Sequence, residues 1–333
     1  AVREDPFFKL QQKIQPTDTD EQGLYGFSMD LYNDLLVVGA PNTSLGSNTK
    51  VGSVYVYSYT SSTNIFTLLQ KITPSISQTD LLFGFNISLY DTYLVVGAPG
   101  FSSKKGQAFV YNYTNNIFKL DQELLASDGS SNDFFGGVVN TYEGTIMISA
   151  AGIDIDTDEG AFIRAKSISN INSTEDKNGC VYVFTENNNT WTQTQIITPD
   201  IDRIQTIVGY DAFGVGLDIY KNNCVIYSTS NDSKIDGVDP TTLRHFSNFK
   251  CYIFSKMGDT WVQVTNDKFT SIYLPINRYG TIPGWYGCQP LKIYENTIIA
   301  STSVLGSTSD NNESSLSLAL QGAVNVYNLN TNN

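Results

Sequence analysis

Acidic residues at alternating positions form the first candidate site in this chain. Asp154, Asp156 and Asp158 lie in the run Asp154-Ile155-Asp156-Thr157-Asp158-Glu159-Gly160. Three carboxylates with this spacing open an EF-hand-like loop, whose oxygen ligands suit Ca²⁺. Glu159 stands where that loop needs Gly, and no clear Glu follows at the last ligand position. A solvated acidic loop is the alternative, and we expect no required cofactor beyond this candidate Ca²⁺.

Groups that could do catalysis are few. The single His, His245, excludes a His-pair metal site and leaves one imidazole base. It lies in a predicted loop insertion, where a surface or packing role is the simpler interpretation. Asp30 and Asp218 lie on the expected innermost strands, where paired carboxylates would suit glycoside hydrolysis. These two residues are scattered along the chain, so we expect the protein not to be an enzyme.

Asn-x-Ser/Thr sequons indicate a secreted or cell-surface protein. The candidate glycosylation sites are Asn42, Asn112, Asn172, Asn188, Asn231 and Asn312, with Asn86 a weaker one. The chain starts at Ala1 without an initiator Met, which fits a mature end after signal-peptide removal or an artificial boundary. Four cysteines are compatible with an oxidising compartment. We therefore expect an extracellular or cell-surface location.

Charge and hydrophobicity exclude two classes of partner. The formal net charge is −13, and no Lys/Arg cluster offsets it, so a phosphate backbone is repelled and nucleic acid is not an expected partner. No apolar run reaches the roughly 18 residues that a membrane-spanning helix needs. We expect no membrane insertion.

Two nearly identical segments indicate the organisation of the chain. Leu35-Leu36-Val37-Val38-Gly39-Ala40-Pro41 follows Tyr25-Gly26 and precedes Gly52-Ser53-Val54-Tyr55-Val56-Tyr57. Leu94-Val95-Val96-Gly97-Ala98-Pro99 follows Phe83-Gly84 and precedes Gly106-Gln107-Ala108-Phe109-Val110-Tyr111. Self-similarity of this length is the signature of a repeat architecture.

Five such units can be traced, each with the pattern of four strands. An aromatic-Gly pair opens each unit, near residues 25, 83, 135, 213 and 286. A Tyr then follows at a nearly constant spacing, at Tyr32, Tyr90, Tyr142, Tyr220 and Tyr294. Second strands start at Leu36, Leu94, Ile146, Cys224 and Ile298, and third strands at Val54, Ala108, Val181, Cys251 and Val324. Segments that begin with an aromatic residue and alternate with period two are the expected fourth strands.

The chain starts with a fourth-type strand and ends just after a third-type strand. The segment 7–15 can therefore complete the last sheet beside Val324 to Tyr327, which closes the ring and hides the sheet edges. We predict an all-β fold, a five-bladed β-propeller of four-stranded antiparallel blades. Residues 1–333 form a single domain in this prediction.

The pattern of Phe-Gly, a short strand, Val-Val-Gly-Ala-Pro and Gly-x-Val-Tyr-Val-Tyr resembles the FG-GAP repeat of integrin α-subunit propellers. The resemblance extends from about Phe7 to Tyr327 and is clearest in the first two units. Such repeats often carry an Asp-rich Ca²⁺ loop between strands one and two. The joints here, such as Tyr32-Asn33-Asp34-Leu35, are too short to supply the ligands. The best-known relatives have seven repeats, whereas five are found in this chain.

Alternating strand directions place Cys251 and Cys288 on one rim of adjacent units, and we predict a disulfide between them. Cys224 replaces a core Leu or Ile and is expected to be a buried thiol. Long loops at Ile153–Asn178, Asn231–Asn248, Asp267–Trp285 and Val304–Leu320 fall on this same rim, over blades three to five. Binding residues concentrate on such loops, although glycan-covered insertions are an equal alternative.

The leading functional hypothesis is a non-enzymatic extracellular propeller that binds protein or glycan through this loop-rich face, in adhesion or surface assembly. A second hypothesis is a structural subunit of a homopolymeric extracellular filament or coat, since an uncharged polar surface suits repeated self-contact. A third is a five-bladed lectin or glycosidase, which rests on analogy with blade number alone.

Overall fold

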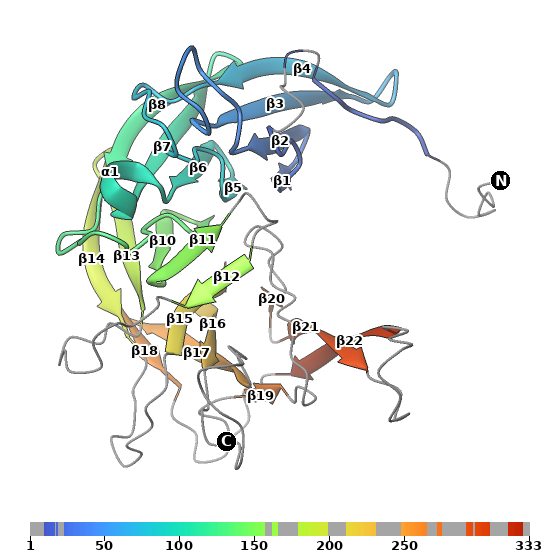
Figure 1. Ribbon diagram of the computed structural model, residues 1–333. Coiled ribbons are helices and arrows are strands. Elements are labelled where there is room, and N and C mark those ends of the chain that lie inside the picture. The colour runs from blue at the N-terminus through green and yellow to red at the C-terminus, as the bar shows by residue number, and fades with distance from the viewer. Residues whose placement is uncertain are drawn as a thin grey trace, which may run out of the picture.

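A computed structural model shows five β-sheets that follow one another around an incomplete ring (Figure 1). It describes residues 10–16, 18, 23–156, 162–165, 179–198, 211–230, 248–264, 272–274, 291–295, 297–306 and 319–328. All the sheets are antiparallel, and their innermost strands face the centre of the ring. This arrangement is that of a β-propeller, as predicted.

The first two sheets have the same four-stranded order. The first contains β1 (Ser28–Tyr32), β2 (Leu35–Ala40), β3 (Ser53–Thr60) and β4 (Ile65–Ile72). The second contains β5 (Ile87–Tyr90), β6 (Tyr93–Ala98), β7 (Gln107–Thr114) and β8 (Ile117–Leu124). A short helix, α1 (Phe101–Lys104), joins β6 to β7.

The remaining sheets follow the same plan with additions and losses. The third contains β9 (Val139–Tyr142), β10 (Thr145–Ala150), β13 (Cys180–Asn187) and β14 (Thr190–Ile197). The fourth contains β15 (Asp211–Tyr220), β16 (Asn223–Ser230), β17 (Asn248–Met257) and β18 (Thr260–Gln263), with β19 (Ile272–Leu274) beside β17. The fifth contains β20 (Leu291–Tyr294), β21 (Thr297–Gly306) and β22 (Ala319–Asn328).

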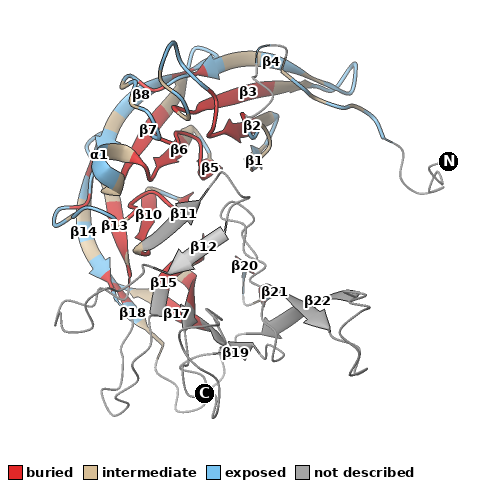
Figure 2. Ribbon diagram, in the orientation of Figure 1, coloured by how far each residue is buried: buried red, intermediate tan, exposed pale blue. Residues whose placement is uncertain are grey.

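The second strands β6 and β10 are buried on both faces, because neighbouring sheets pack against both. Val95 and Val96 are fully buried in β6, as are Ile146 and Met147 in β10. Two adjacent strand residues point to opposite faces, so both faces must be covered. The outermost strands β4, β8 and β14 alternate instead between exposed and buried residues (Figure 2).

Glycines form the joints between blades. A Cβ on Gly97 would lie 2.0 Å from the backbone oxygen of Gly136, in the next blade. A Cβ on Gly39 would likewise lie 2.2 Å from the backbone oxygen of Gly84. Gly84 and Gly136 also have φ angles of +85° and +90°, which side chains rarely adopt. The Gly of Gly-Ala-Pro and the Gly of aromatic-Gly are thus two halves of one close contact.

Glutamine side chains join the outermost strands of successive blades. The Gln70 Nε2 donates to the Phe118 carbonyl at 2.9 Å, and its Oε1 accepts from the Phe118 amide at 2.8 Å. The same two bonds join three further pairs, Gln12 to Phe66, Gln122 to Trp191, and Gln195 to Trp261. We call these four pairs the glutamine forks. Each one connects a blade to the next at its outer edge.

The amino-terminal segment takes the place of an outermost strand beside β4. Residues 10–16 pair with no strand among the described residues, and the fifth sheet has three strands there. Gln12 nevertheless makes a glutamine fork with Phe66, as a fourth strand of a preceding blade would. Met29 and Leu31 on β1 are 64% and 57% exposed, whereas the corresponding residues of β5 are buried. Closure of the ring by residues 7–15 stays a prediction.

Two segments differ from the sequence-based expectation. Ile153 to Asp156 form β11, which pairs with β12 (Phe162–Ala165), so part of the first long loop is a hairpin. Strand β17 begins at Asn248, before the expected start at Cys251.

Within the described part of the chain, no helix is long and apolar enough to cross a membrane.

Candidate functional site

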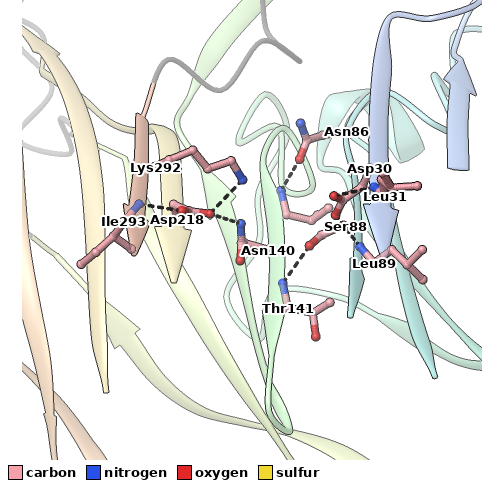
Figure 3. A network of polar contacts seen from close by, with 11 residues as sticks. Asp30, Leu31, Asn86, Ser88, Leu89, Asn140, Thr141, Asp218, Lys292 and Ile293 are labelled. Carbon is pink, nitrogen blue, oxygen red and sulfur yellow. Dashed lines mark hydrogen bonds and ion pairs between the residues drawn. The ribbon is translucent and has the colours of Figure 1, made fainter. Parts of the chain in front are cut away.

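One polar or charged residue from each innermost strand lies two positions before the Tyr that ends the strand. These residues are Asp30, Ser88, Asn140, Asp218 and Lys292, from β1, β5, β9, β15 and β20. We call this set the polar belt (Figure 3). The innermost strands of neighbouring blades contact one another, so the belt runs around the centre of the ring.

The belt is connected from blade to blade by hydrogen bonds to the backbone. Three amides of a following blade donate to it: Leu89 to Asp30 at 2.7 Å, Thr141 to Ser88 at 3.1 Å, and Ile293 to Asp218 at 2.8 Å (Figure 3). At the remaining junction, between the third and fourth blades, the side-chain Nδ2 of Asn140 donates to Asp218 Oδ1 at 2.9 Å. Each bond joins two innermost strands that have no ladder bonds between them.

Asp218 is the most heavily engaged member of the belt. Its residue is 5% exposed, and its Oδ1 also accepts from the Lys292 Nζ at 3.1 Å. Burial raises the pKa of Asp218, and the Lys292 charge and the bonds from Ile293 and Asn140 oppose that rise. These donors stabilise the buried carboxylate. Without them, the cost of removing the carboxylate from water would destabilise the folded protein.

Asp30 has a related environment on the first blade. Its Oδ1 accepts from the Leu31 amide at 2.9 Å, and its Oδ2 accepts the Leu89 bond. Burial raises the pKa of Asp30, the positive charge of Lys292 lowers it, and the negative charge of Asp218 raises it further. Lys292 therefore acts on both carboxylates, although they belong to the first and fourth blades.

The two carboxylates are hydrogen-bonded within the protein. All four oxygens of Asp30 and Asp218 accept at least one hydrogen bond from the protein. The belt therefore connects blades, and the charge that it offers to solvent is the largely exposed Lys292.

The tyrosines that end the innermost strands form a second continuous feature. Successive rings lie with their centroids 5.1, 4.5, 5.4 and 4.7 Å apart, from Tyr32 through Tyr90, Tyr142 and Tyr220 to Tyr294. We call these five residues the tyrosine arc. Tilted aromatic pairs at such distances are each worth roughly 0.5–1.5 kcal/mol beyond their buried area.

Two of the three predicted metal ligands lie in the β11–β12 hairpin. Asp154 and Asp156 belong to β11, whose backbone is a strand where the sequence indicated a calcium loop. Asp158 lies outside the described residues. No group of three or more His, Cys, Asp or Glu side chains that could hold a metal ion occurs in the described part. The site stays a prediction, and its EF-hand-like loop geometry is wrong at residues 153–156.

The cysteines lie deeper than expected. Cys251 carries a free thiol that is buried among Val225, Ile253 and Ile298. The early start of β17 explains this position, because Cys251 lies inside the strand and away from the rim. Cys288, its predicted partner, lies outside the described residues, and Cys251 forms no disulfide in this structure. Cys224 is a buried thiol, as predicted.

The described sequons differ in their access to solvent. Asn188 is exposed in the turn between β13 and β14, where a glycan would fit, and Asn112 is half-buried within β7. Asn42 is 8% exposed, which leaves little room for a glycan on the folded chain, and its glycosylation stays a prediction. Asn86, the weaker candidate, is buried and its Oδ1 accepts from the Val139 amide at 2.8 Å (Figure 3).

Several predicted residues lie outside the described part of the chain. They are Asn172, Asn231, His245 and Asn312, together with most of the four long loops. The predicted loop-rich face therefore stays a prediction.

Sequence reasoning identified two members of the polar belt and missed the other three. Asp30 and Asp218 were recognised as carboxylates of innermost strands, whereas Ser88, Asn140 and Lys292 were not considered. Their shared position, two residues before a regularly spaced Tyr, was the available signal. The Tyr spacing itself was read as a marker of the strand, and its lateral contacts were not anticipated.

A family model for the FG-GAP repeat matches residues 8–57 and 118–162. The first match extends through β1 and β2 into β3, and the second begins in the outermost strand β8 and extends through β9 and β10. The second match includes the blade in which Ser149-Ala150-Ala151 replaces Gly-Ala-Pro. FG-GAP repeats are therefore present in the chain, as the sequence resemblance indicated. No curated protein matches the chain.

Solved structures align with most of the chain at very low identity. A protein from Lactobacillus plantarum shares 10% identity over 80% of this chain and 60% of that chain, with a TM-score of 0.40. The periplasmic gluconolactonase of Pseudomonas aeruginosa shares 12% identity over 70% of this chain and 68% of its own, with a TM-score of 0.34. Sqt1 from Saccharomyces cerevisiae shares 11% identity over 85% of this chain and 81% of its own, with a TM-score of 0.35.

Proposed function

We propose that this FG-GAP repeat protein is a non-enzymatic extracellular propeller that binds a protein or glycan partner. The observation that carries the proposal is the bonding of the polar belt. Three of the four oxygens of its two carboxylates accept hydrogen bonds from a neighbouring blade, and the fourth, Asp30 Oδ1, accepts from Leu31 in its own strand, so the carboxylates act as parts of a scaffold. A rigid scaffold that presents loops and turns at its rims suits recognition.

The partner surface in this proposal is the loop-rich face of blades three to five. The antiparallel order of the sheets puts the loops between second and third strands on one rim, together with the aromatic-Gly starts of the blades. The loops of the first two blades on this rim are short, whereas that of the third contains the hairpin of β11 and β12. The third blade thus carries a longer loop on this rim than the first two blades do.

An extracellular location accords with an exposed sequon at Asn188 and with a net charge of −13, which disfavours nucleic acid. Secretion of the full chain from a eukaryotic host, followed by intact-mass measurement, tests this part. A glycan mass that Asn188→Gln removes would support it. An unglycosylated chain that stays inside the cell would contradict it.

Binding is tested with arrays of extracellular proteins and of glycans, probed with the wild-type protein. A matched variant replaces residues 153–178 with a short Gly-Ser linker, and a second variant shortens the turn at Asn188-Asn189 as a control on the opposite rim. We expect a specific partner that the first variant loses and the control keeps. Chromogenic glycosides and lactones should give no turnover, and turnover that Asp218→Asn abolishes would overturn the non-enzymatic proposal.

A further inference from the structure

The rim that carries the tyrosine arc is opposite to the loop-rich face. In the first four blades the aromatic-Gly pair lies at or just before the start of the innermost strand and the Tyr is its last residue, so the two features mark opposite rims. Tyr32, Tyr90, Tyr142 and Tyr220 are half-buried, and Tyr294 is 64% exposed. Part of every ring in the arc therefore reaches solvent. An arc of five aromatic rings on one rim is a surface that the proposed loop face does not use.

Carboxylates accompany the arc. Asp91, Glu143 and Glu295 directly follow Tyr90, Tyr142 and Tyr294, and Asp34 lies two residues after Tyr32. All four carboxylates are exposed, and they lie in or beside the tight turns that end the innermost strands. Lys221, after Tyr220, is the one cation among the residues that directly follow the arc tyrosines.

That lysine shows how the arc accommodates a positive charge. The Lys221 Nζ lies over the Tyr220 ring, 5.1 Å from its centroid. An ammonium at this distance is attracted by the electron-rich face of the ring. The chain itself thus provides one example of a cation held on an arc tyrosine.

The phenols of Tyr90 and Tyr142 are neutral at physiological pH, because their pKa values are raised. Burial, the adjacent Tyr90 and the Glu143 carboxylate raise the pKa of Tyr142. Burial and the carboxylates of Glu143 and Asp91 likewise raise the pKa of Tyr90. Positive charge is attracted by the ring faces and by the carboxylates together, with no need to ionise a phenol.

We propose that the tyrosine arc and its four carboxylates bind an extended, Lys/Arg-rich segment of a partner protein. The negative rim selects for positive charge, and the aromatic faces add an attraction that charge alone does not supply. The arc crosses all five blades, which offers several cationic side chains a ring each and suits an extended segment better than a single small ion. The surface is separate from the loop-rich face and can be tested independently of it.

The test titrates the wild-type protein into fluorescein-labelled octa-arginine and follows fluorescence anisotropy at low and at physiological salt. We expect binding that weakens with salt. The double variant Tyr90→Ala/Tyr142→Ala should lose about tenfold in affinity or more, since a cation on a ring contributes roughly 0.5–2 kcal/mol. Its net charge equals that of the wild type, so the loss would separate ring contacts from bulk attraction. Tyr90→Phe/Tyr142→Phe keeps the rings and should bind within about twofold of the wild type.

Two further variants complete the test. Asp91→Asn/Glu143→Gln should bind about threefold more weakly and with a shallower salt dependence. Tyr113→Ala, which removes a half-buried ring on an outer strand, should bind as the wild type does. Circular dichroism establishes that each variant is folded, and if the alanine variant does not fold, the charge variant decides the outcome.

Three outcomes would overturn the proposal. One is unchanged affinity in the folded alanine variant or in the charge variant. Another is no binding of octa-arginine by the wild type at low salt. The third is displacement of the peptide by neutral maltohexaose, which would make the arc a sugar platform.

Discussion

The two ends of an innermost strand both carry an aromatic residue, but the two rings have different roles. In the third blade, Phe135 precedes β9 and is fully buried against Tyr182 and Phe184. Tyr142 ends the same strand, is half-buried, and contacts Tyr90 and Tyr220 of the neighbouring blades. Both recur at regular spacing, so regular spacing alone does not distinguish a packing residue from a surface one.

The difference between the ends comes from what surrounds each ring. Phe135 lies in a hydrophobic cluster formed by two adjacent blades, next to glycines that bring their backbones into contact. Tyr142 lies beside a tight turn with an exposed carboxylate at Glu143. The end at Phe135 is closely packed, whereas the end at Tyr142 has ring surface available to a partner. This contrast predicts large stability effects at the glycine end and small ones at the tyrosine end.

The largest effect should come from removing a buried ring. Phe135→Ala is expected to lower the free energy of unfolding by about 3–5 kcal/mol, because it leaves a cavity between two blades. Tyr142→Ala should cost roughly 1 kcal/mol, since its ring is already partly in solvent. Urea unfolding of both variants measures the difference. Equal costs at the two positions would remove the contrast between the ends.

A methyl group at the blade joint should have the next largest effect. Gly97→Ala places a Cβ about 2.0 Å from the Gly136 oxygen, so the two blades must separate, at a cost of about 3 kcal/mol. Gly144→Ala is the matched control, because Gly144 has φ +70° but no atom within 4 Å of a Cβ. The control should cost only about 1 kcal/mol, for its backbone conformation. Thermal unfolding that ranks the two in the opposite order would contradict the interpretation of the joint as a steric one.

Asp218→Asn should cost about 2 kcal/mol at acid pH, because the Asn Nδ2 cannot accept the hydrogen bonds that a carboxyl oxygen accepts at that position. The cost should also depend on pH. Burial raises the pKa of Asp218 in the folded protein above its ordinary value of 3.8, so the native state holds the proton more tightly than the unfolded state. The stabilisation by Asp218 is fully present below that ordinary value and declines as the pH rises past it. Denaturant titrations from acid to neutral pH measure the difference in free energy of unfolding between the wild type and Asp218→Asn. This difference should decrease as the pH rises, and an increase would contradict the prediction.

The smallest effect is expected at an outer edge, far from either end of the innermost strands. Gln122→Ala removes both bonds of one glutamine fork to Trp191 and should cost about 1–2 kcal/mol. Gln193→Ala is the control, because the Gln193 amide bonds only to the exposed Ser127 hydroxyl and backbone, and it should cost under about 0.5 kcal/mol. Thermal unfolding of both variants gives the comparison, and equal melting temperatures would deny the forks a role in stability.

The blades were predictable because each strand carries its own local pattern. The Val-Val pairs of β2 and β6 indicate strands buried on both faces, and the aromatic-Gly pairs mark where each unit starts. The start of β17 was placed too late because Asn248, Phe249 and Lys250 carry no pattern that the other third strands share. The hairpin of β11 and β12 was missed because alternating Asp residues suit a strand as well as a metal loop.

The polar belt could not be predicted in the same way. Its members are Asp, Ser, Asn, Asp and Lys, so only Asp occurs twice, and every partner except Leu31 of Asp30 belongs to another blade. Only the fold brings Leu89 to Asp30 or Ile293 to Asp218. Their common position becomes meaningful once the strand register is known.

The glutamine forks have a consequence for how such a chain could change its length. Each fork reaches from one outermost strand to the next with the same two bonds, whichever blades it joins. A duplicated unit would therefore carry both the Gln side chain and the aromatic residue whose backbone bonds to such a Gln. It could form a fork with each of its two new neighbours without further changes in sequence. Duplication of whole units is compatible with the outer edge of this fold. At the centre, acidic, neutral and basic side chains pair between particular blades, so a new copy would have to match its neighbours there.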